Sequence, residues 1–142
     1  MSVSITQIAT LLFSMSRVMR GKGDDPYSQL RLEALSFIET QKDPTMKDIA
    51  SYFSIAPPTA TSLVNGLVAE KYLMRITDKS DRRIVRIIIT VKGRLVLREG
   101  HKRKLEKIER KFAPLNGKER EELARILEKI IAHYQHKSDN KK

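Results

Sequence analysis

Two short amphipathic segments with only three residues between them constrain the fold of this chain more than any other feature. The first runs from Met46 to about Phe53, and Thr45 in front of it is a residue type that caps helices. The second opens with Pro57 and Pro58, which a first helical turn tolerates because its N–H groups have no intrahelical partners. The pattern predicts two short helices that pack across a tight turn.

A β-hairpin is predicted directly after the second helix. Tyr72–Thr77 and Arg83–Thr90 are rich in β-branched and aromatic residues, and residues 78–82 between them are polar and turn-forming. The order of helix, turn, helix and hairpin is that of a winged helix-turn-helix. In that fold the second helix enters the major groove of DNA, and the hairpin, called the wing, reaches the neighbouring groove or the backbone.

Further helices are predicted on both sides of this region. Before it, one helix ends near Gly21 and a second follows. After it, Thr90 can cap a long helix, and Asn116 with Glu119 has the pattern of a capping box that opens a last helix. The apolar stripe of the first helix fits either a core helix or a seam between two copies. This stripe consists of Ile5, Ile8, Leu12, Met15 and Met19.

Positive charge is the compositional feature that says most about function. The chain has 28 Lys and Arg against 17 Asp and Glu, which gives a formal net charge of +11. Residues 71–111 alone hold 15 Lys and Arg against 5 Asp and Glu, so the excess is local. Such a surface gains affinity for phosphates by releasing counterions. Nucleic acid is therefore the predicted partner, ahead of an anionic membrane or a charge that only aids solubility.

The outward face of the second short helix carries short, uncharged side chains. Hydroxyls can bond base edges or phosphates, Asn suits adenine, and a Thr methyl can contact a thymine methyl. Because no Arg is present to pair with guanine, we expect sequence discrimination by this helix to be modest or shared with the wing. A solvated polar face is the alternative. The residues predicted to contact DNA are Pro57, Pro58, Thr59, Thr61, Ser62 and Asn65.

The tip of the hairpin combines positive charges with a turn. Long basic side chains there can enter a narrow minor groove, where the negative potential is enhanced. Asp81 stands two residues before Arg83 and can hold its guanidinium, so Arg83 is predicted to make the main wing contact. A solvated charged turn is the alternative. The predicted wing residues are Lys79, Asp81, Arg82, Arg83 and Arg86, with Thr45, Lys47 and Arg75 as supporting DNA contacts.

No catalytic, metal or cofactor site is predicted. The chain has no Cys, which excludes disulfides, thiolate metal sites and cysteine-based sensing. Only His133 and His136 are close among the three histidines, and no Cys or carboxylate pair completes a metal site with them. The sequence lacks a P-loop, a dinucleotide-binding glycine pattern and a nucleophile elbow. We therefore do not expect an enzyme.

The amino-terminal segment does not have the pattern of a signal peptide. Residues 1–20 are amphipathic, and their positive charges come late, at Arg17 and Arg20. No segment approaches the ~20 apolar residues that span a bilayer. We expect a cytoplasmic protein with no membrane partner.

Two stretches of the chain resemble the MarR family of bacterial and archaeal regulators. The first is the helix-turn-helix segment, residues 46–67. The second begins with Tyr72–Arg75, continues with Asp78–Arg83 and closes with Ile89–Gly93. Asp-x-Arg, a hydrophobic strand and Thr-x-x-Gly form a fairly specific combination when they follow a helix-turn-helix at this distance. With the surrounding helices, the resemblance covers residues 5–134.

The resemblance implies a mainly α fold with a small β-hairpin wing, organised as a single domain over residues 1–142. Residues 27–90 would form the DNA-binding region, residues 91–111 a long connecting helix, and residues 1–26 and 112–142 the dimerisation helices. The implied homodimer reads a palindrome in double-stranded DNA, with Arg83 in the minor groove and Thr59, Thr61, Ser62 and Asn65 at the major groove. Family members often repress, and many release DNA on binding a small aromatic compound. We therefore expect a repressor with a small aromatic or anionic effector.

Two residues depart from the pattern of the family. Lys71 stands where a Gly commonly precedes the hairpin, so the end of the preceding helix needs another solution. Ala56 replaces the more usual capping residue in front of the second short helix, which is the predicted recognition helix. Both departures concern local geometry.

Two other functions fit parts of the sequence. An architectural DNA-binding protein would need only charge and shape, without a strong sequence preference. A basic RNA-binding module would explain the charge but not the wing, and Tyr52, Phe53 and Tyr72 are expected in the core and not on a stacking surface.

Overall fold

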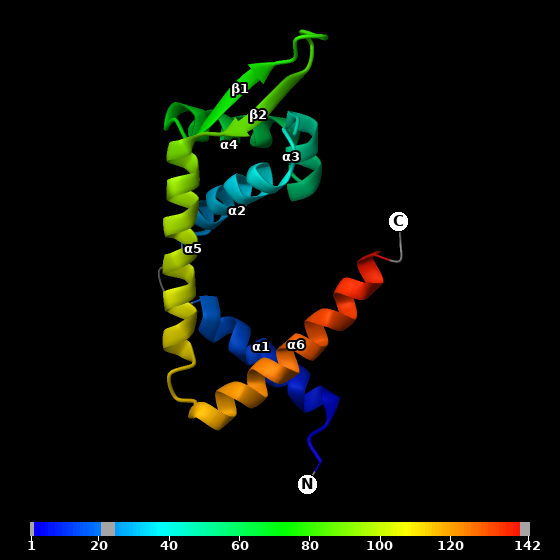
Figure 1. Ribbon diagram of the computed structural model, residues 1–142, viewed down its shortest axis with the longest axis vertical. Helices are drawn as coiled ribbons and strands as arrows, with labels where there is room; N and C mark the ends of the chain where they lie inside the picture. Colours follow the sequence, from blue (N-terminus) through cyan, green and yellow to red (C-terminus); the bar gives the residue numbers. More distant parts are fainter. Residues whose placement is uncertain (1, 21–24, 140–142) are drawn as a thin grey trace. The chain divides into compact units, whose positions relative to one another are not determined.

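The computed structural model describes residues 2–20 and 25–139 of the chain (Figure 1). The chain divides into two compact units, residues 1–105 and 106–142. The predicted mainly α fold with a two-stranded wing is confirmed. The elements of the described residues are α1 (Ile5–Arg20), α2 (Pro26–Thr40), α3 (Met46–Phe53), α4 (Pro57–Ala69), β1 (Leu73–Thr77), β2 (Val85–Ile89), α5 (Val91–Lys111) and α6 (Gly117–Asp139). The boundary between the units falls within α5.

Side-chain caps set the start of several helices. The Thr45 hydroxyl accepts a hydrogen bond from the N–H of Asp48, and the Asp48 carboxylate accepts one from the N–H of Thr45 at 2.7 Å, so α3 begins with a capping box. Asn116 and Glu119 form the same reciprocal pair at the start of α6, as the sequence predicts. The hydroxyl of Thr90 accepts from the N–H of Gly93 at 3.0 Å and caps α5. These caps satisfy N–H groups that the helices themselves leave unpaired.

The two strands of the wing pair antiparallel, from Leu73 opposite Ile89 to Thr77 opposite Val85. The segment before α3 adds to this hairpin. The N–H of Ile87 donates to the carbonyl of Pro44 at 3.0 Å, and Thr45 forms an antiparallel bridge with Arg86. The start of the helix-turn-helix is therefore tied to the second strand of the wing.

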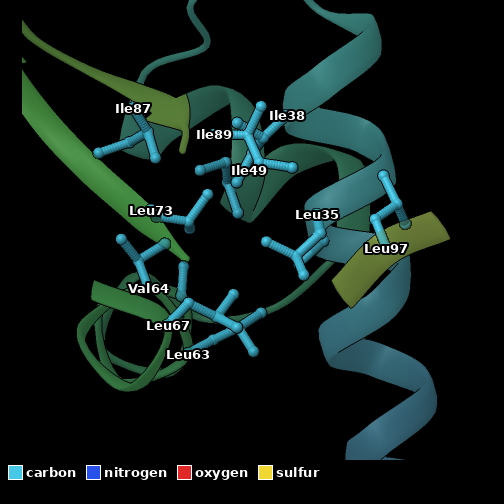
Figure 2. Close-up of a cluster of buried hydrophobic side chains, with 12 residues drawn as sticks. Leu35, Ile38, Ile49, Leu63, Val64, Leu67, Leu73, Ile87, Ile89 and Leu97 are labelled. Atoms are coloured by element: carbon cyan, nitrogen blue, oxygen red, sulfur yellow. The ribbon is translucent and has the colours of Figure 1, made fainter. Parts of the chain in front are cut away.

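The core lies where α2, α3, α4, the hairpin and the first turns of α5 meet. Figure 2 shows apolar side chains from these elements pointing toward one another. Burying one such Leu or Ile side chain stabilises the fold by about 1.5–3 kcal/mol. The core fixes the angle between α3 and α4 and holds the wing beside them. Its residues are Ala34, Leu35, Ile38, Ile49, Ala60, Leu63, Val64, Leu67, Leu73, Ile87, Ile89 and Leu97.

The wing strands are shorter than the sequence predicts. β2 begins at Val85 because Arg83 and Ile84 belong to the turn: the N–H of Arg83 donates to the Asp81 carboxylate at 2.9 Å, and the N–H of Ile84 donates to the Asp81 carbonyl at 3.0 Å. β1 begins at Leu73 because the N–H of Tyr72 still donates to the last turn of α4.

Lys71 ends α4 without the glycine that the resemblance leads one to expect. Its backbone adopts a left-handed conformation, with φ of 64°. The carbonyl of Lys71 accepts a hydrogen bond from the Thr90 hydroxyl at 2.7 Å, and the Lys92 ammonium donates to the carbonyl of Glu70 at 3.1 Å. Groups from the start of α5 therefore satisfy the carbonyls at this end of α4.

Both α1 and α6 expose apolar side chains within their own units. No residue of α1 is buried, and Ile5 and Phe13 are 85% and 77% exposed. In the second unit, the exposed apolar side chains of α6 include Ile126, Leu127, Ile130 and Ile131. Each helix therefore presents apolar surface that its own unit does not cover.

Candidate nucleic-acid interface

The outward face of α4 consists of small or uncharged side chains. Ala60, Leu63, Val64 and Leu67 bury the opposite face of this helix in the core. The six residues predicted to contact DNA are all exposed. Helical spacing places Pro58, Ser62 and Asn65 most directly opposite the buried face, with Thr61 and Thr59 at its two sides.

The hydroxyl of Thr61 already donates a hydrogen bond within α4. It donates to the carbonyl of Pro57, four residues earlier, at 3.0 Å. Its oxygen keeps free lone pairs and can still accept a hydrogen bond. Thr61 therefore offers DNA an acceptor and a methyl group.

The start of α4 explains how Ala56 can stand in the capping position. Ala56 makes no side-chain cap, but Pro57 and Pro58 occupy the first helical positions. A proline has no N–H, so two of the groups that a cap normally satisfies do not exist here. The N–H of Ala60 donates to the Ala56 carbonyl at 3.1 Å. Only the N–H of Thr59 is left for a cap to satisfy.

Two aspartates organise the tip of the wing. The Asp78 carboxylate accepts hydrogen bonds from the N–H groups of Ser80 and Asp81 at 2.8 and 3.2 Å, and also from the Ser80 hydroxyl. The Asp81 carboxylate accepts from the backbone of Arg83. The sequence predicts a contact between Asp81 and the guanidinium of Arg83, whereas the structure has the carboxylate at the N–H of the same residue. Asp81 therefore holds the turn from which Arg83 projects.

These hydrogen bonds leave the cations of the tip on the surface. Lys79, Arg82 and Arg83 are all exposed, and no acidic side chain in the described part of the chain forms an ion pair with them. In Figure 1 the turn that carries them lies at the free end of the hairpin, beyond α3 and α4. Long, exposed cations at a projecting turn can reach a phosphate or a narrow minor groove.

The pKa of Asp78 reflects the same network. Hydrogen bonds lower this pKa from its ordinary 3.8 to about 2, and the Ser80 hydroxyl contributes most, followed by the N–H groups of Ser80 and Asp81. Hydrogen bonds stabilise the charged form of a carboxyl, so Asp78 stays ionised over the whole range in which proteins bind DNA. Asp78 is therefore a charged acceptor for these hydrogen bonds at neutral and mildly acidic pH.

Arg86 joins the wing to the helix-turn-helix. Its guanidinium donates to the carbonyl of Asp43 at 3.0 Å and lies 3.6 Å from the carboxylate of Asp78. Asp43 has a left-handed backbone, with φ of 51°. The side chain that the sequence assigns to a phosphate contact thus spans from the wing to the loop before α3, at the side of the hairpin and not at its tip.

The three predicted supporting residues have different surroundings. Thr45 is half-buried, and its hydroxyl is part of the capping box of α3. Lys47 is exposed and lines a hollow of about 370 Å³ between α3 and α4, together with Pro57 and Thr61. Arg75 is exposed on β1 and donates from Nη2 to the amide oxygen of Asn65 on α4. The structure therefore brings Arg75 to the recognition helix.

Sequence reasoning missed Asp78 as the organiser of the tip. An Asp followed two residues later by Ser is a known signal for a side chain that accepts from the backbone of a turn, and it could have found this residue. No comparable sequence signal links Arg75 to Asn65, because ten positions separate them and the packing of β1 against α4 brings them together.

No cluster of three or more His, Cys, Asp or Glu side chains among the described residues could hold a metal ion. The side chain of His136 lies outside the described part, and the ring of His133 packs edge-on against Tyr134. None of the described helices has the length and the apolar composition needed to cross a membrane.

Comparison with known proteins gives matches to transcriptional regulators. The chain is 28% identical over 89 residues to the uncharacterized HTH-type transcriptional regulator YpoP of Bacillus subtilis, and the match spans 63% of each chain. The transcriptional regulator Tm0710 of Thermotoga maritima superposes with a TM-score of 0.74 at 21% identity, over 94% of this chain and 98% of that one. FabT of Streptococcus pneumoniae, solved in complex with DNA, gives 0.62 at 22% identity, over 97% and 100%. The structural matches show a shared fold.

The similarity to the MarR family lies in the segment that holds most of α2, the helix-turn-helix and the first part of the wing. The model of the MarR family matches residues 28–85. This segment includes Asp81, Arg83 and the whole exposed face of α4. Residues 28–85 of this chain are therefore similar to the MarR family, within a winged helix-turn-helix fold.

Proposed function

We propose that the chain is a transcriptional regulator that binds double-stranded DNA with a sequence preference, as a homodimer on a palindromic operator, and that it acts as a repressor. The observation that carries the proposal is the pairing of two surfaces in one unit. The exposed face of α4 carries short side chains that can approach base edges in the major groove. The tip of the adjoining wing carries Lys79, Arg82 and Arg83 without acidic partners among the described residues.

The wing gives the sharpest test of DNA binding. Replacing Arg83 by Ala should weaken binding to a selected palindromic site by about tenfold or more, because one cation in a groove is lost. Lys118→Ala removes an exposed positive charge from α6 and serves as the control. A gel-shift titration measures both variants against the unchanged protein. Equal affinity of Arg83→Ala and the unchanged protein would remove the wing from the mechanism.

The palindrome follows from the proposed dimer. Two copies related by a two-fold axis present two recognition helices to half-sites about one helical turn, ~34 Å, apart. The exposed apolar faces of α1 and α6 support a second copy, because monomers rarely expose so many large apolar side chains. Sedimentation should give a dimer for the unchanged protein, and Ile130→Glu should shift it toward monomer. A monomeric unchanged protein at micromolar concentration would contradict the dimer.

An architectural role is the second candidate, and one observation favours it. The exposed face of α4 has no Arg or Lys, so this helix offers no bidentate contact of the kind most common in sequence-specific binding. Competition with random DNA at rising salt separates the two functions. A regulator keeps a tighter site when phosphate contacts are screened, whereas an architectural protein loses all sites together.

The proposal includes release from DNA by a small aromatic or anionic compound. A hollow of about 300 Å³ supports it, because this hollow lies where the end of α2 and the loop before α3 meet β2 and the start of α5. Its lining includes Ile38, Ile88, Lys42 and Arg94. A panel of small aromatic acids added to the gel shift tests this part separately, and the loss of the complex at one of them is the expected result.

A further inference from the structure

Asn65 and Arg75 form a pair at the exposed side of the recognition helix. Arg75 lies on β1, which runs beside α4 (Figure 1), and its Nη2 donates to the Oδ1 of Asn65. Both residues are exposed. Asn65 lies one turn from Ser62 on the face directed away from the core. The pair therefore belongs to the surface that the proposed function assigns to the major groove.

The chemistry of arginine fixes the orientation of the Asn65 amide. A guanidinium has five N–H donors and no acceptor, so the amide atom that faces it must be the oxygen. The NH₂ group of Asn65 then points to the other side. The donors that the pair keeps available are then the NH₂ group of Asn65 and the remaining N–H groups of Arg75.

Base edges in the major groove differ in whether they match two donors. Guanine presents two acceptors, N7 and O6, whereas adenine presents one acceptor and the N6 donor. An unpaired Asn pairs with adenine by using both its oxygen and its NH₂. The Asn65 oxygen keeps a second lone pair, but it lies beside the Arg75 guanidinium, so the N6 donor of adenine would approach next to a positive charge, whereas the two acceptors of guanine are attracted to it. The pairing with Arg75 therefore disfavours adenine.

We propose that Arg75 orients Asn65 so that the pair reads guanine and not adenine in the major groove. This inference rests on the proposed function and adds a specificity to it. It makes Arg75 a positioning residue for a base contact, in addition to any phosphate contact that its charge provides. It also supplies the recognition helix with a guanine contact, although that helix has no Arg of its own.

The test is a selection of bound fragments from random DNA with the unchanged full chain and four variants. Asn65→Ala identifies the operator position that Asn65 reads, because the preference at that position is lost. The unchanged protein should prefer guanine over adenine there by about tenfold. Arg75→Met should move the preference toward adenine, because the freed amide can then pair through both of its atoms.

Asn65→Asp tests the role of the Asn65 NH₂ group without removing Arg75. An aspartate keeps an oxygen for the guanidinium but has no NH₂ to donate, so the guanine preference should fall by about tenfold. Lys79→Met is the control for lost charge, and it should lower affinity at all sequences without changing the base at this position. Both Asn65 and Arg75 are exposed, and thermal unfolding verifies that each variant folds.

The outcomes separate the inference from the function on which it rests. Adenine at the Asn65 position in the unchanged protein, or the same base preference before and after Arg75→Met, overturns the role of the pair while regulation by sequence stands. A selection that enriches no sequence with the unchanged protein overturns the proposed function, and the inference with it. No positional change with Asn65→Ala overturns the base contact itself.

Discussion

Gly93 on α5 faces the backbone carbonyl of Tyr72, at the junction between the recognition helix and the wing. A Cβ at position 93 would lie 2.2 Å from the carbonyl oxygen of Tyr72 and 2.7 Å from a side-chain carbon of Ile89. The same carbonyl accepts a hydrogen bond from the N–H of Thr90 at 3.0 Å. The Thr-x-x-Gly sequence is thus the point at which α5 closes onto the chain that leaves α4.

Replacing Gly93 by Ala should destabilise the fold strongly. The added carbon meets backbone, which cannot turn aside as a flexible side chain can, so α5 or the strand must shift. We expect a loss of about 3 kcal/mol in the free energy of unfolding. Urea denaturation at fixed protein concentration measures it.

Two other glycines provide the controls for this substitution. At Gly100 the atoms nearest to a Cβ would be side-chain carbons of Leu32, the first at 2.4 Å, and at Gly117 a Cβ would meet nothing within 4 Å. Gly100→Ala should therefore cost less than Gly93→Ala, and Gly117→Ala should stay within about 0.5 kcal/mol of the unchanged protein. Equal costs at positions 93 and 117 would show that the close approach to Tyr72 has no energetic consequence.

Lys71 should be a site where glycine is more stable than alanine. A Cβ in the left-handed region costs about 1–2 kcal/mol, whereas glycine loses about 0.5–1 kcal/mol through its freer unfolded chain. Since Lys71 has φ of 64°, the free energy of unfolding should be higher for Lys71→Gly than for Lys71→Ala. The expected difference is about 0.5–1 kcal/mol. The opposite order, as inside an ordinary helix, would contradict the backbone conformation.

The stability of the chain should depend on Asp78 at acidic pH. The pKa of this carboxyl is about 2 in the fold, below its ordinary 3.8. A carboxyl whose pKa is lowered in the folded state contributes stability that is fully present above about pH 4 and is lost as the pH falls toward 2. Asp78→Asn should therefore show a weaker decline in the free energy of unfolding between pH 4 and pH 2.

An NMR titration of the Asp78 carboxyl checks the cause of this shift. The Ser80 hydroxyl contributes most to the lowered pKa, so Ser80→Ala should raise the titration midpoint of Asp78 toward its ordinary value. Arg86→Met should raise it less, because the charge of Arg86 is the smallest of the causes that lower this pKa. A midpoint that Ser80→Ala leaves unchanged would remove the hydroxyl from the network.

The sequence was sufficient to predict features that depend on nearby residues. Thr45, Thr90 and the pair of Asn116 and Glu119 act as caps, because a cap needs only a side chain and the N–H groups two or three positions away. The turn between α3 and α4 was predictable for the same reason. Helical periodicity also gave the buried face of α4.

Features that depend on distant residues were not predictable in this way. The charge of Arg86 predicts a phosphate contact, but its guanidinium donates to the carbonyl of Asp43, which is 43 positions earlier and is brought close by the bridge between Thr45 and Arg86. The residue type of Asn65 predicts a contact with adenine, but the packing of β1 against α4 gives it Arg75 as a partner. Charge and residue type predict what a side chain can bond, and the fold decides which partner it meets.

Replacing Arg86 by Met and replacing Arg82 by Met should therefore affect different properties, stability in the first case and DNA binding in the second. Arg86→Met removes the hydrogen bond to Asp43 and the ion pair with Asp78, and we expect a loss of about 1 kcal/mol in the free energy of unfolding. Arg82 is exposed at the tip, so Arg82→Met should leave stability within about 0.5 kcal/mol and instead reduce the salt dependence of DNA binding by about one phosphate contact. Urea denaturation and gel shifts at several salt concentrations measure the two effects on the same proteins. If Arg86→Met kept full stability and lost DNA affinity as Arg82→Met does, then Arg86 would serve mainly as a phosphate contact, and the wing would be held to the helix-turn-helix by its backbone hydrogen bonds alone.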